Sequence, residues 1–395
     1  MVHNLILVVD DDEFQRELIG MQLDALGGCN VLFADSGAEA LAQFDRHGHA
    51  IAVIISDLSM PGMDGLVLMR HLAQRGYAAS FVLLSGMTDE ILSSAAGLAQ
   101  AHKLDLLGVM SKPCSPERLR DMLARRQPYS RALSPQHIEQ ALTPERLTQA
   151  LAAGEFVPWY QPKVDIHTGK TVSVEALARW PTESGGMIGP ASFVPAIESC
   201  NLSDALFFAM AGQVLRDLAN WRGQGKRLQA AINMSMDTAL DLEMPERLLT
   251  LVVGVGLQPA DLIIEVTESR LMVQRTLAME TLTRLSLMGF ILSIDDFGTG
   301  YTSLGQLVDL PFKELKIDAS FVQRASAESK AEAILRISVT IGQTLGMSVI
   351  AEGVETHAQM EFLRGCGGTI VQGYHLARPM PYAACTEWLA RETSI

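Results

Sequence analysis

The sequence lacks several features that would assign a protein to a class at once. Its 395 residues include only 5 cysteines, none of them in a C-x-x-C pair, which argues against a disulfide framework or a zinc knuckle. Positive charge is also scarce, since 31 Lys and Arg residues stand against 45 Asp and Glu residues. The resulting formal net charge of −14 argues against a protein held to nucleic acid by a basic face. The histidines form no H-x-x-x-H pair, and no apolar run approaches the length of a membrane span. We therefore expect a cytoplasmic protein with reduced thiols, no direct DNA binding and no membrane segment.

What the chain does have is enough length for two domains. A single core is not expected at 395 residues, and an apolar fraction of 48% with 19% charged residues is typical of a globular protein. We place a first domain at residues 1–126, a linker with two prolines at 127–143 and a second domain at 144–395. The second domain should open with a helix, because Thr143 suits an N-cap and Pro144 the first helical position.

Residues 1–126 alternate short apolar runs with helical stretches. The runs lie at 5–9, 31–34, 52–55, 81–84 and 106–110, and continuously apolar strands separated by helices predict a doubly wound α/β fold with a five-stranded parallel sheet. The site in such a sheet lies just past the carboxyl ends of the strands. Three carboxylates, a hydroxyl and an ammonium there predict a divalent-cation site with an oxygen nucleophile. These residues are Asp10, Asp11, Asp57, Ser85 and Lys112.

The whole of this first segment resembles the receiver domain of bacterial response regulators. The resemblance rests on VVDD at 8–11, DLSMPGMDG at 57–65, LSG at 84–86 and SKP at 111–113. One position departs from the family pattern. The family usually has a Tyr or Phe three residues before the lysine, and the rotamer of that ring reports phosphorylation. Val109 occupies this position here, so the usual aromatic switch residue is replaced.

The receiver resemblance implies a role for each residue of this predicted site. Asp57 would accept a phosphoryl group from a sensor histidine kinase or a phosphotransfer protein. Asp11 would bind one Mg²⁺ directly, and Asp10 would act mainly through water. Ser85 would donate a hydrogen bond to the incoming phosphoryl group, and Lys112 would pair with it.

Residues 144–395 predict a second α/β domain. We expect a hairpin of strands at 156–165 and 171–177, followed by six more strand runs, each with a helical stretch behind it. This repeated alternation predicts a TIM-like (β/α)8 barrel with an N-terminal hairpin, in which the residues at the carboxyl ends of the strands meet at one mouth. The residues that end the six runs are polar: Asn233, Glu265, Asp295, Lys316, Glu352 and Gln372.

The sequence DDFGTGY at 295–301 places two adjacent carboxylates directly after an apolar strand run. In a cleft such neighbours would repel each other and be pushed toward protonation unless a cation held them. Carboxylate and amide oxygens suit Mg²⁺ or Mn²⁺ and are too oxygen-rich a set for zinc. So many carboxylates in one cleft predict two such cations. The candidate ligands are Glu175, Asn233, Glu265, Asp295, Asp296 and Glu352.

EALARW at 175–180 resembles the signature of the EAL family of cyclic-di-GMP phosphodiesterases, and the resemblance covers essentially all of 150–395. Supporting motifs are IN at 232–233, EVTE at 265–268, KID at 316–318, AEGVE at 351–355 and QGY at 372–374. The order of receiver then EAL domain resembles response regulators that hydrolyse cyclic-di-GMP under the control of phosphorylation. The resemblance also implies at least a homodimer, or a tetramer.

The mechanism implied by the EAL resemblance is a two-metal in-line displacement. One cation would be bound by Glu175, Asn233, Glu265 and Asp295, and the second would share Asp295 and add Asp296 and Glu352. A hydroxide between the cations, formed from water, would attack phosphorus and open one phosphodiester to give linear pGpG. Lys316 would hold that water, although Glu352 could instead act as the general base. On this view Glu175, Lys316 and Glu352 are the catalytic residues.

Four further residues are implied to contact the substrate or to support the site. Arg179, which we place one helical turn past Glu175, would meet a phosphate through a forked contact. Gln161 and Gln372 would contact substrate or water. Glu268 would anchor the loop at 295–301 rather than bind a metal.

Two other readings of the second domain stay open. It could be a catalytically silent receptor that binds cyclic-di-GMP and signals by protein contacts, although such domains usually lose a metal ligand or the loop motif. It could also be a barrel with an unrelated substrate.

Overall fold

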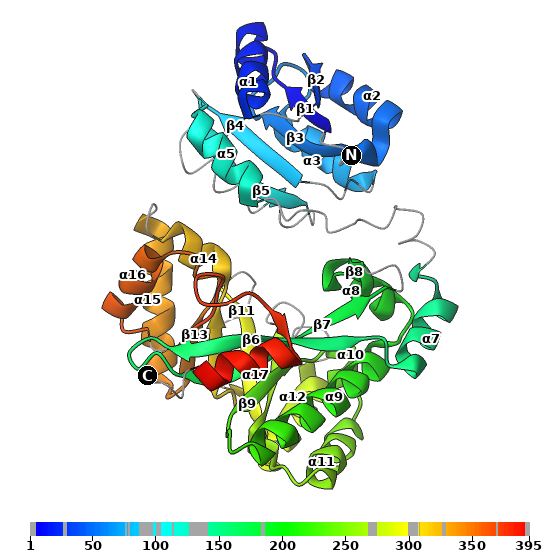
Figure 1. Cartoon of the computed structure of the whole chain (residues 1–395), viewed down its shortest axis with the longest axis vertical. Helices are drawn as coiled ribbons and strands as arrows, with labels where there is room; N and C mark the ends of the chain where they lie inside the picture. The colour runs from blue at the N-terminus through cyan, green and yellow to red at the C-terminus, as the bar shows by residue number, and fades with distance from the viewer. Residues whose placement is uncertain are drawn as a thin grey trace. The chain divides into compact units, whose positions relative to one another are not determined.

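A computed structural model of the chain describes residues 5–26, 30–75, 77, 80–86, 98–99, 104–112, 114–125, 141–182, 186–267, 275–298, 307, 309–325, 329–368 and 370–391. The chain divides into two compact units, Met1–Pro135 and Gln136–Ile395, whose labelled elements are drawn in Figure 1. The predicted linker at 127–143 lies largely outside the described residues, so its bounds stay a prediction.

The first unit is built on a parallel sheet of five strands in the order β2-β1-β3-β4-β5 (Figure 1). Its strands are β1 (Leu5–Val9), β2 (Asn30–Ala34), β3 (Ile51–Asp57), β4 (Ser80–Ser85) and β5 (Asp105–Ser111). Its described helices are α1 (Glu13–Leu26), α2 (Gly37–His47), the 3-10 turn η1 (Gly48–Ala50), α3 (Gly65–Gln74) and α5 (Pro116–Arg125).

Two separate apolar clusters cover the two faces of this sheet. Leu41 of α2 and Leu68 of α3 pack with Leu7 and Ile54 on one face. Ile19 of α1 and Leu119 of α5 pack on the other face, with Val8 and Val53 among other strand residues. Because successive side chains of a strand point to opposite faces, a strand covered on both sides must be apolar throughout, as the inner strand β1 is. The predicted doubly wound fold is confirmed.

The second unit is a closed eight-stranded barrel in the order β6-β14-β13-β12-β11-β10-β9-β7, with β7 pairing back to β6. The strands are β6 (Val157–Asp165), β7 (Thr171–Pro181), β9 (Gln229–Asn233), β10 (Leu262–Thr267), β11 (Ile291–Phe297), β12 (Glu314–Ile317), β13 (Ser348–Ala351) and β14 (Ile370–Val371). β6 runs antiparallel to both of its barrel neighbours, because it forms a hairpin with β7. The predicted (β/α)8 barrel with an N-terminal hairpin is therefore confirmed, with one reversed strand.

Helices and short strands fill the connections around the barrel (Figure 1). The described ones are α7 (Pro144–Ala153), β8 (Met187–Ile188), α8 (Pro190–Ser199), α9 (Ser203–Gly223), α10 (Met236–Ala239), α11 (Met244–Gly254), η2 (Pro259–Asp261), α12 (Arg275–Leu287), α14 (Ala319–Arg324), α15 (Ser329–Thr344), α16 (His357–Gly365), β15 (Met380–Pro381) and α17 (Tyr382–Arg391). None of the described helices combines the length and apolar character that a membrane crossing requires.

The first helix of this unit begins as predicted. The side chain of Thr143 accepts a hydrogen bond from the backbone N–H of Arg146, Pro144 is the first helical residue, and Gly154 ends the helix in a left-handed conformation. These are the residues that helix ends favour, since each satisfies or tolerates the unpaired backbone groups there.

The alternation of side chains along the barrel strands places polar groups on the inside. In β10, Ile264 and Val266 pack in the large apolar cluster between strands and helices. Glu265 lies between them in sequence and therefore points to the opposite, inner face. The same reasoning places Lys316 inside, because Leu315 and Ile317 on either side belong to that cluster. The large apolar cluster thus lies between the barrel wall and the helices, and Glu265 and Lys316 lie inside the barrel.

Candidate functional site

The predicted site residues of the second unit meet at the carboxyl ends of the parallel strands. Their positions are Glu175 on β7, Asn233 at the end of β9, Glu265 on β10, Asp295 and Asp296 on β11, Lys316 on β12, Glu352 directly after β13 and Gln372 directly after β14. Ion pairs and hydrogen bonds join these residues across the barrel. Their convergence follows from the fold, because parallel strands end at the same mouth.

Lys316 stands at the centre of this group. Its ammonium nitrogen lies 2.8 Å from Glu352 Oε1, 2.9 Å from Glu265 Oε2, 3.0 Å from Asp295 Oδ1 and 3.6 Å from Glu175 Oε2. Burial disfavours its charged form, but the four surrounding carboxylates outweigh burial and hold the pKa of Lys316 well above its usual value. Lys316 is thus a fixed positive charge in the middle of the site.

Side-chain amides hold both carboxylate oxygens of Glu175. Gln372 Nε2 donates to Glu175 Oε2 at 2.6 Å and to Gln161 Oε1 at 3.0 Å, and Asn233 Nδ2 donates to Glu175 Oε1 at 3.1 Å. Gly373 lets Gln372 come this close, because a Cβ there would collide with the backbone of Val354. The structure therefore brings together the three residues at 161, 175 and 372 that the sequence assigned to catalysis and substrate contact.

The carboxylates differ widely in how readily they ionise. Burial, with the charges of Asp295 and Glu175, raises the pKa of Glu352 to about 8 against the opposing effect of Lys316. Burial and the neighbouring carboxylate of Asp295 likewise raise the pKa of Asp296 to about 7. Without further cations, the site therefore holds protons near neutral pH.

Asp295, Asp296 and Glu352 each offer a carboxylate oxygen within 4.8 Å of the others, a spacing that fits a metal ion. Asp296 reaches this arrangement with a φ of 56°, a left-handed conformation that is uncommon for a residue with a side chain, and functional sites are where such strain gathers. The ligand atoms offered are all hard carboxylate oxygens. The raised pKa values of Asp296 and Glu352 indicate that nearby positive charge does not balance these carboxylates. The residues present thus fit Mg²⁺ or Mn²⁺.

A cavity of about 390 Å³ opens over these residues. Its lining includes the charged residues Glu175, Asp295, Lys316 and Glu352, and also Tyr374, which is 44% exposed. Glu355 adds another carboxylate. Among the described residues that line it, Lys316 alone is cationic, so an anionic ligand would need added positive charge to enter.

Arg179 is not placed as predicted. It does not lie one helical turn past Glu175, because both residues belong to the extended strand β7. Four residues span roughly 13 Å along a strand, against about 6 Å along a helix. Its Nη1 donates to the carbonyl of Ala178 at 2.9 Å, and its guanidinium lies 5.9 Å from the ring centre of Trp159. The long hairpin with β6 keeps this segment extended.

Two predictions fall on residues that the structure does not describe. Glu268, the predicted loop anchor, lies outside the described residues, and so do positions 299–301 of the loop that it would anchor. Both stay predictions.

Sequence reasoning missed a second buried lysine below the site. Lys163 on β6 is fully buried, and its ammonium nitrogen lies 2.7 Å from Glu265 Oε1 and 3.6 Å from Glu314 Oε2. Burial opposes ionisation of Glu265, but the charges of Lys163 and Lys316 outweigh it and lower the pKa of Glu265 to about 2. The signal was present, since Lys163 follows Gln161 by two residues and must share its face of the strand.

The first unit gathers its predicted residues at the carboxyl end of its sheet. Asp10, Asp11 and Asp57 offer carboxylate oxygens within 4.8 Å of one another, and Lys112 Nζ lies 2.7 Å from Asp10 Oδ2 and 2.8 Å from Asp57 Oδ2. Burial raises the pKa of Asp10, although the hydrogen bond with Lys112 acts in the opposite direction. Ser85 is buried at the end of β4, and its carbonyl accepts from the backbone N–H of Lys112.

Val109, which occupies the position of the usual aromatic residue, lies on β5. It is half-buried and packs against the apolar cluster that also contains Leu83.

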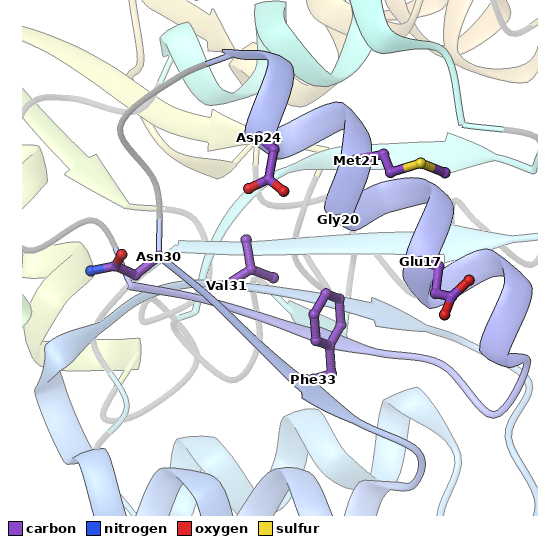
Figure 2. Close-up of a pocket in the computed structure, with 7 residues that line it drawn as sticks. All are labelled: Glu17, Gly20, Met21, Asp24, Asn30, Val31 and Phe33. Atoms are coloured by element: carbon purple, nitrogen blue, oxygen red, sulfur yellow. The ribbon is translucent and has the colours of Figure 1, made fainter.

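A larger cavity, about 540 Å³, lies in the first unit between α1 and the edge strand β2. Figure 2 shows its lining: Glu17, Gly20, Met21, Asp24, Asn30, Val31 and Phe33. A Cβ at Gly20 would lie 2.7 Å from the ring of Phe33, so the helix approaches this strand through bare backbone. None of the predicted site residues lines this cavity.

Comparisons with known proteins agree with this geometry. A family model for the EAL domain matches residues 144–379, and one for the response regulator receiver domain matches residues 6–124. The chain is 35% identical to cyclic di-GMP phosphodiesterase RocR of Pseudomonas aeruginosa, over 95% of this chain and 96% of that protein.

Relatives of the barrel unit alone are also found. The bifunctional diguanylate cyclase/cyclic di-GMP phosphodiesterase MucR of Pseudomonas aeruginosa is 38% identical over 62% of this chain, which spans only 36% of that longer protein. A solved structure of PaMucR phosphodiesterase in complex with c-di-GMP superposes with a TM-score of 0.57 at 38% identity, covering 60% of this chain and 96% of that one. The chain therefore belongs to the EAL domain family, with a response regulator receiver domain ahead of its EAL domain.

Proposed function

We propose that this protein is a metal-dependent phosphodiesterase that hydrolyses cyclic-di-GMP to linear pGpG. The observation that carries the proposal is the ring of carboxylates around Lys316 at the barrel mouth, with a cavity above it. Similarity to RocR over nearly the whole chain supports the same substrate.

The proposed metal ligands are the oxygens that the strands bring to this mouth. Bound there, two divalent cations would polarise the phosphate and lower the pKa of a water molecule. Mg²⁺ and Mn²⁺ are the ions that this oxygen set favours. One ion is assigned to Glu175, Asn233, Glu265 and Asp295, and the other to Asp295, Asp296 and Glu352.

The chain's own groups would orient the reacting water. Lys316 would donate a hydrogen bond to it, and Glu352 would accept its proton, since its Oε1 lies 2.8 Å from the Lys316 nitrogen and so beside the same water. The water oxygen forms a new bond to phosphorus, the bond from phosphorus to the 3′ oxygen breaks, and that oxygen leaves with a proton. Gln372 would keep Glu175 in place throughout. Gln161 and Arg179 are proposed to contact the substrate, and Glu268 to anchor the loop at 295–301.

In the first unit, Asp57 is the proposed phosphoryl acceptor. Asp10 and Asp11 would hold one Mg²⁺, and Ser85 and Lys112 would stabilise the added charge. The donor would be a sensor histidine kinase or a phosphotransfer protein. We propose that phosphorylation raises the phosphodiesterase rate by changing how units or subunits pack. A homo-oligomer and a cytoplasmic location complete the proposal.

Incubation of the purified chain with cyclic-di-GMP and Mn²⁺ or Mg²⁺ tests the function. Chromatography should show pGpG, and chelation of the metal should stop its formation. Tight binding of cyclic-di-GMP without any pGpG would overturn the proposal and support a silent receptor.

A further inference from the structure

Lys163 carries a charge that the mechanism above does not use. Its side chain has no exposed surface, and its ammonium nitrogen donates to Glu265 Oε1 at 2.7 Å. Lys163 does not line the cavity, whereas Gln161 two residues earlier does. Lys163 therefore acts on the reaction only through the groups around it, of which Glu265 is its nearest carboxylate partner.

Glu265 is held at both ends of its carboxylate. Oε1 accepts from Lys163, and Oε2 accepts from Lys316 at 2.9 Å. Because Lys316 lines the cavity, Oε2 is the oxygen on the side of the metal ligands. With Oε1 taken by Lys163, the carboxylate cannot turn to offer both oxygens to one cation.

Glu314 is the other partner of Lys163 and supports a plainer explanation. It opens β12, and its Oε2 lies 3.6 Å from the ammonium nitrogen, too far for a good hydrogen bond. That oxygen accepts no hydrogen bond from the described residues. Lys163 could therefore serve only to neutralise Glu314, since a buried carboxylate without a partner is costly. The distances favour Glu265 as its principal partner.

We propose that Lys163 is a positioning residue of the metal centre, which holds Oε1 of Glu265 and so presents Oε2 alone to a divalent cation. The inference rests on the proposed function, because it takes Glu265 as a metal ligand. Groups that fix a metal ligand from behind typically contribute 10–100-fold to metal affinity. Lys163 thus sets how tightly the site binds its cation.

The test is calorimetric titration of the full chain with Mn²⁺ in the absence of substrate. Asp11→Asn is present in every variant and in the wild-type reference, so that the proposed cation site of the first unit does not contribute. Lys163→Met should weaken Mn²⁺ binding about 10–100-fold, and Lys163→Arg should restore part of the loss. Glu314→Gln is the matched control and should bind Mn²⁺ as the wild type does. At saturating Mn²⁺ the kcat of Lys163→Met should recover to within a few-fold of the wild type, because Lys163 does not line the cavity.

The double variant Lys163→Met with Glu314→Gln separates the two explanations. It removes both members of that pair, so it leaves no unpaired Glu314 and remains useful if Lys163→Met alone does not fold. Positioning predicts weak Mn²⁺ binding in the double variant. Binding as tight as in the wild type would show that Lys163 only neutralises Glu314, and the inference would be wrong. A wild type that binds no Mn²⁺ would instead contradict the proposed function itself.

Discussion

The ammonium nitrogen of Lys316 lies 2.8 Å from Oε1 of Glu352, and both side chains line the cavity at the barrel mouth. One lysine is thus the shared partner of carboxylates from four different strands or strand ends. It offsets only part of their charge, because the pKa values of Glu352 and Asp296 are still raised. The carboxylates are therefore already held close together by Lys316, and part of their negative charge is left uncompensated.

Lys316→Met should destabilise the metal-free protein by about 3–5 kcal/mol, because it strands buried carboxylates without their partner. Mn²⁺ should recover much of this loss by replacing the missing charge. Urea unfolding in chelator and in Mn²⁺ measures both effects. Lys313→Met, at an exposed lysine three residues earlier, is the matched control and should change little. Equal stability of the two variants in chelator would contradict the central role of Lys316.

Glu352→Gln should lower kcat by about 10²–10⁴, the usual contribution of a positioned proton acceptor. The change keeps the size of the side chain, so equilibrium binding of cyclic-di-GMP should persist. Steady-state rates and a fluorescence binding titration together check this. Glu361→Gln on the exposed face of α16 is the control. Full activity in Glu352→Gln would remove Glu352 from the catalytic set.

The stability of the metal-free barrel should fall as pH rises from about 4 to about 8. Glu352 and Asp296 have folded-state pKa values of about 8 and about 7, well above their ordinary values of 4.5 and 3.8. The folded state therefore holds protons that the unfolded chain has released in this range, and stability is lost as those protons leave.

Unfolding free energies measured in chelator across this pH range check the slope. Saturating Mn²⁺ should remove it, because cations take the place of the protons. Glu352→Gln should reduce the slope without any metal and leave the part that is due to Asp296. A stability that rises with pH in chelator would contradict the assigned protonation states.

Much of this site could be predicted, because a polar residue at the carboxyl end of a parallel barrel strand is expected at the barrel mouth. Asn233, Asp295 and Glu352 each follow an apolar run, and each reaches the barrel mouth. The antiparallel β6 was also foreseeable, since the turn after Asp165 is too short for a crossover helix.

The roles of Lys163 and Arg179 could not be predicted, because they depend on contacts between strands that are far apart in the sequence or on hairpin pairing. Lys163 reads as part of a strand, and only the closed barrel shows that it meets Glu265, 102 residues later. Arg179 was misplaced because four-residue spacing suggests a helix, whereas hairpin pairing keeps β7 extended as far as Pro181. Local pattern does not report such tertiary constraints.

Phosphorylation of Asp57 should raise the rate of pGpG formation several-fold. The acyl phosphate would carry about −1.5 to −2 charges where the free carboxylate carries −1, beside Lys112, which already contacts Asp57 at 2.8 Å. The measurement is the rate with and without an acyl-phosphate donor. Asp57→Asn should not respond, whereas Asp45→Asn, at an exposed carboxylate, should respond as the wild type does. Identical responses in both variants would contradict the assignment of Asp57.

The central claim is that the carboxylates at the barrel mouth bind two divalent cations. Anomalous X-ray diffraction from crystals soaked in Mn²⁺ tests it most directly. The account predicts two peaks, one among Glu175, Asn233, Glu265 and Asp295, and one between Asp296 and Glu352. A mouth without anomalous signal at saturating Mn²⁺, or peaks bound by other residues, would contradict it.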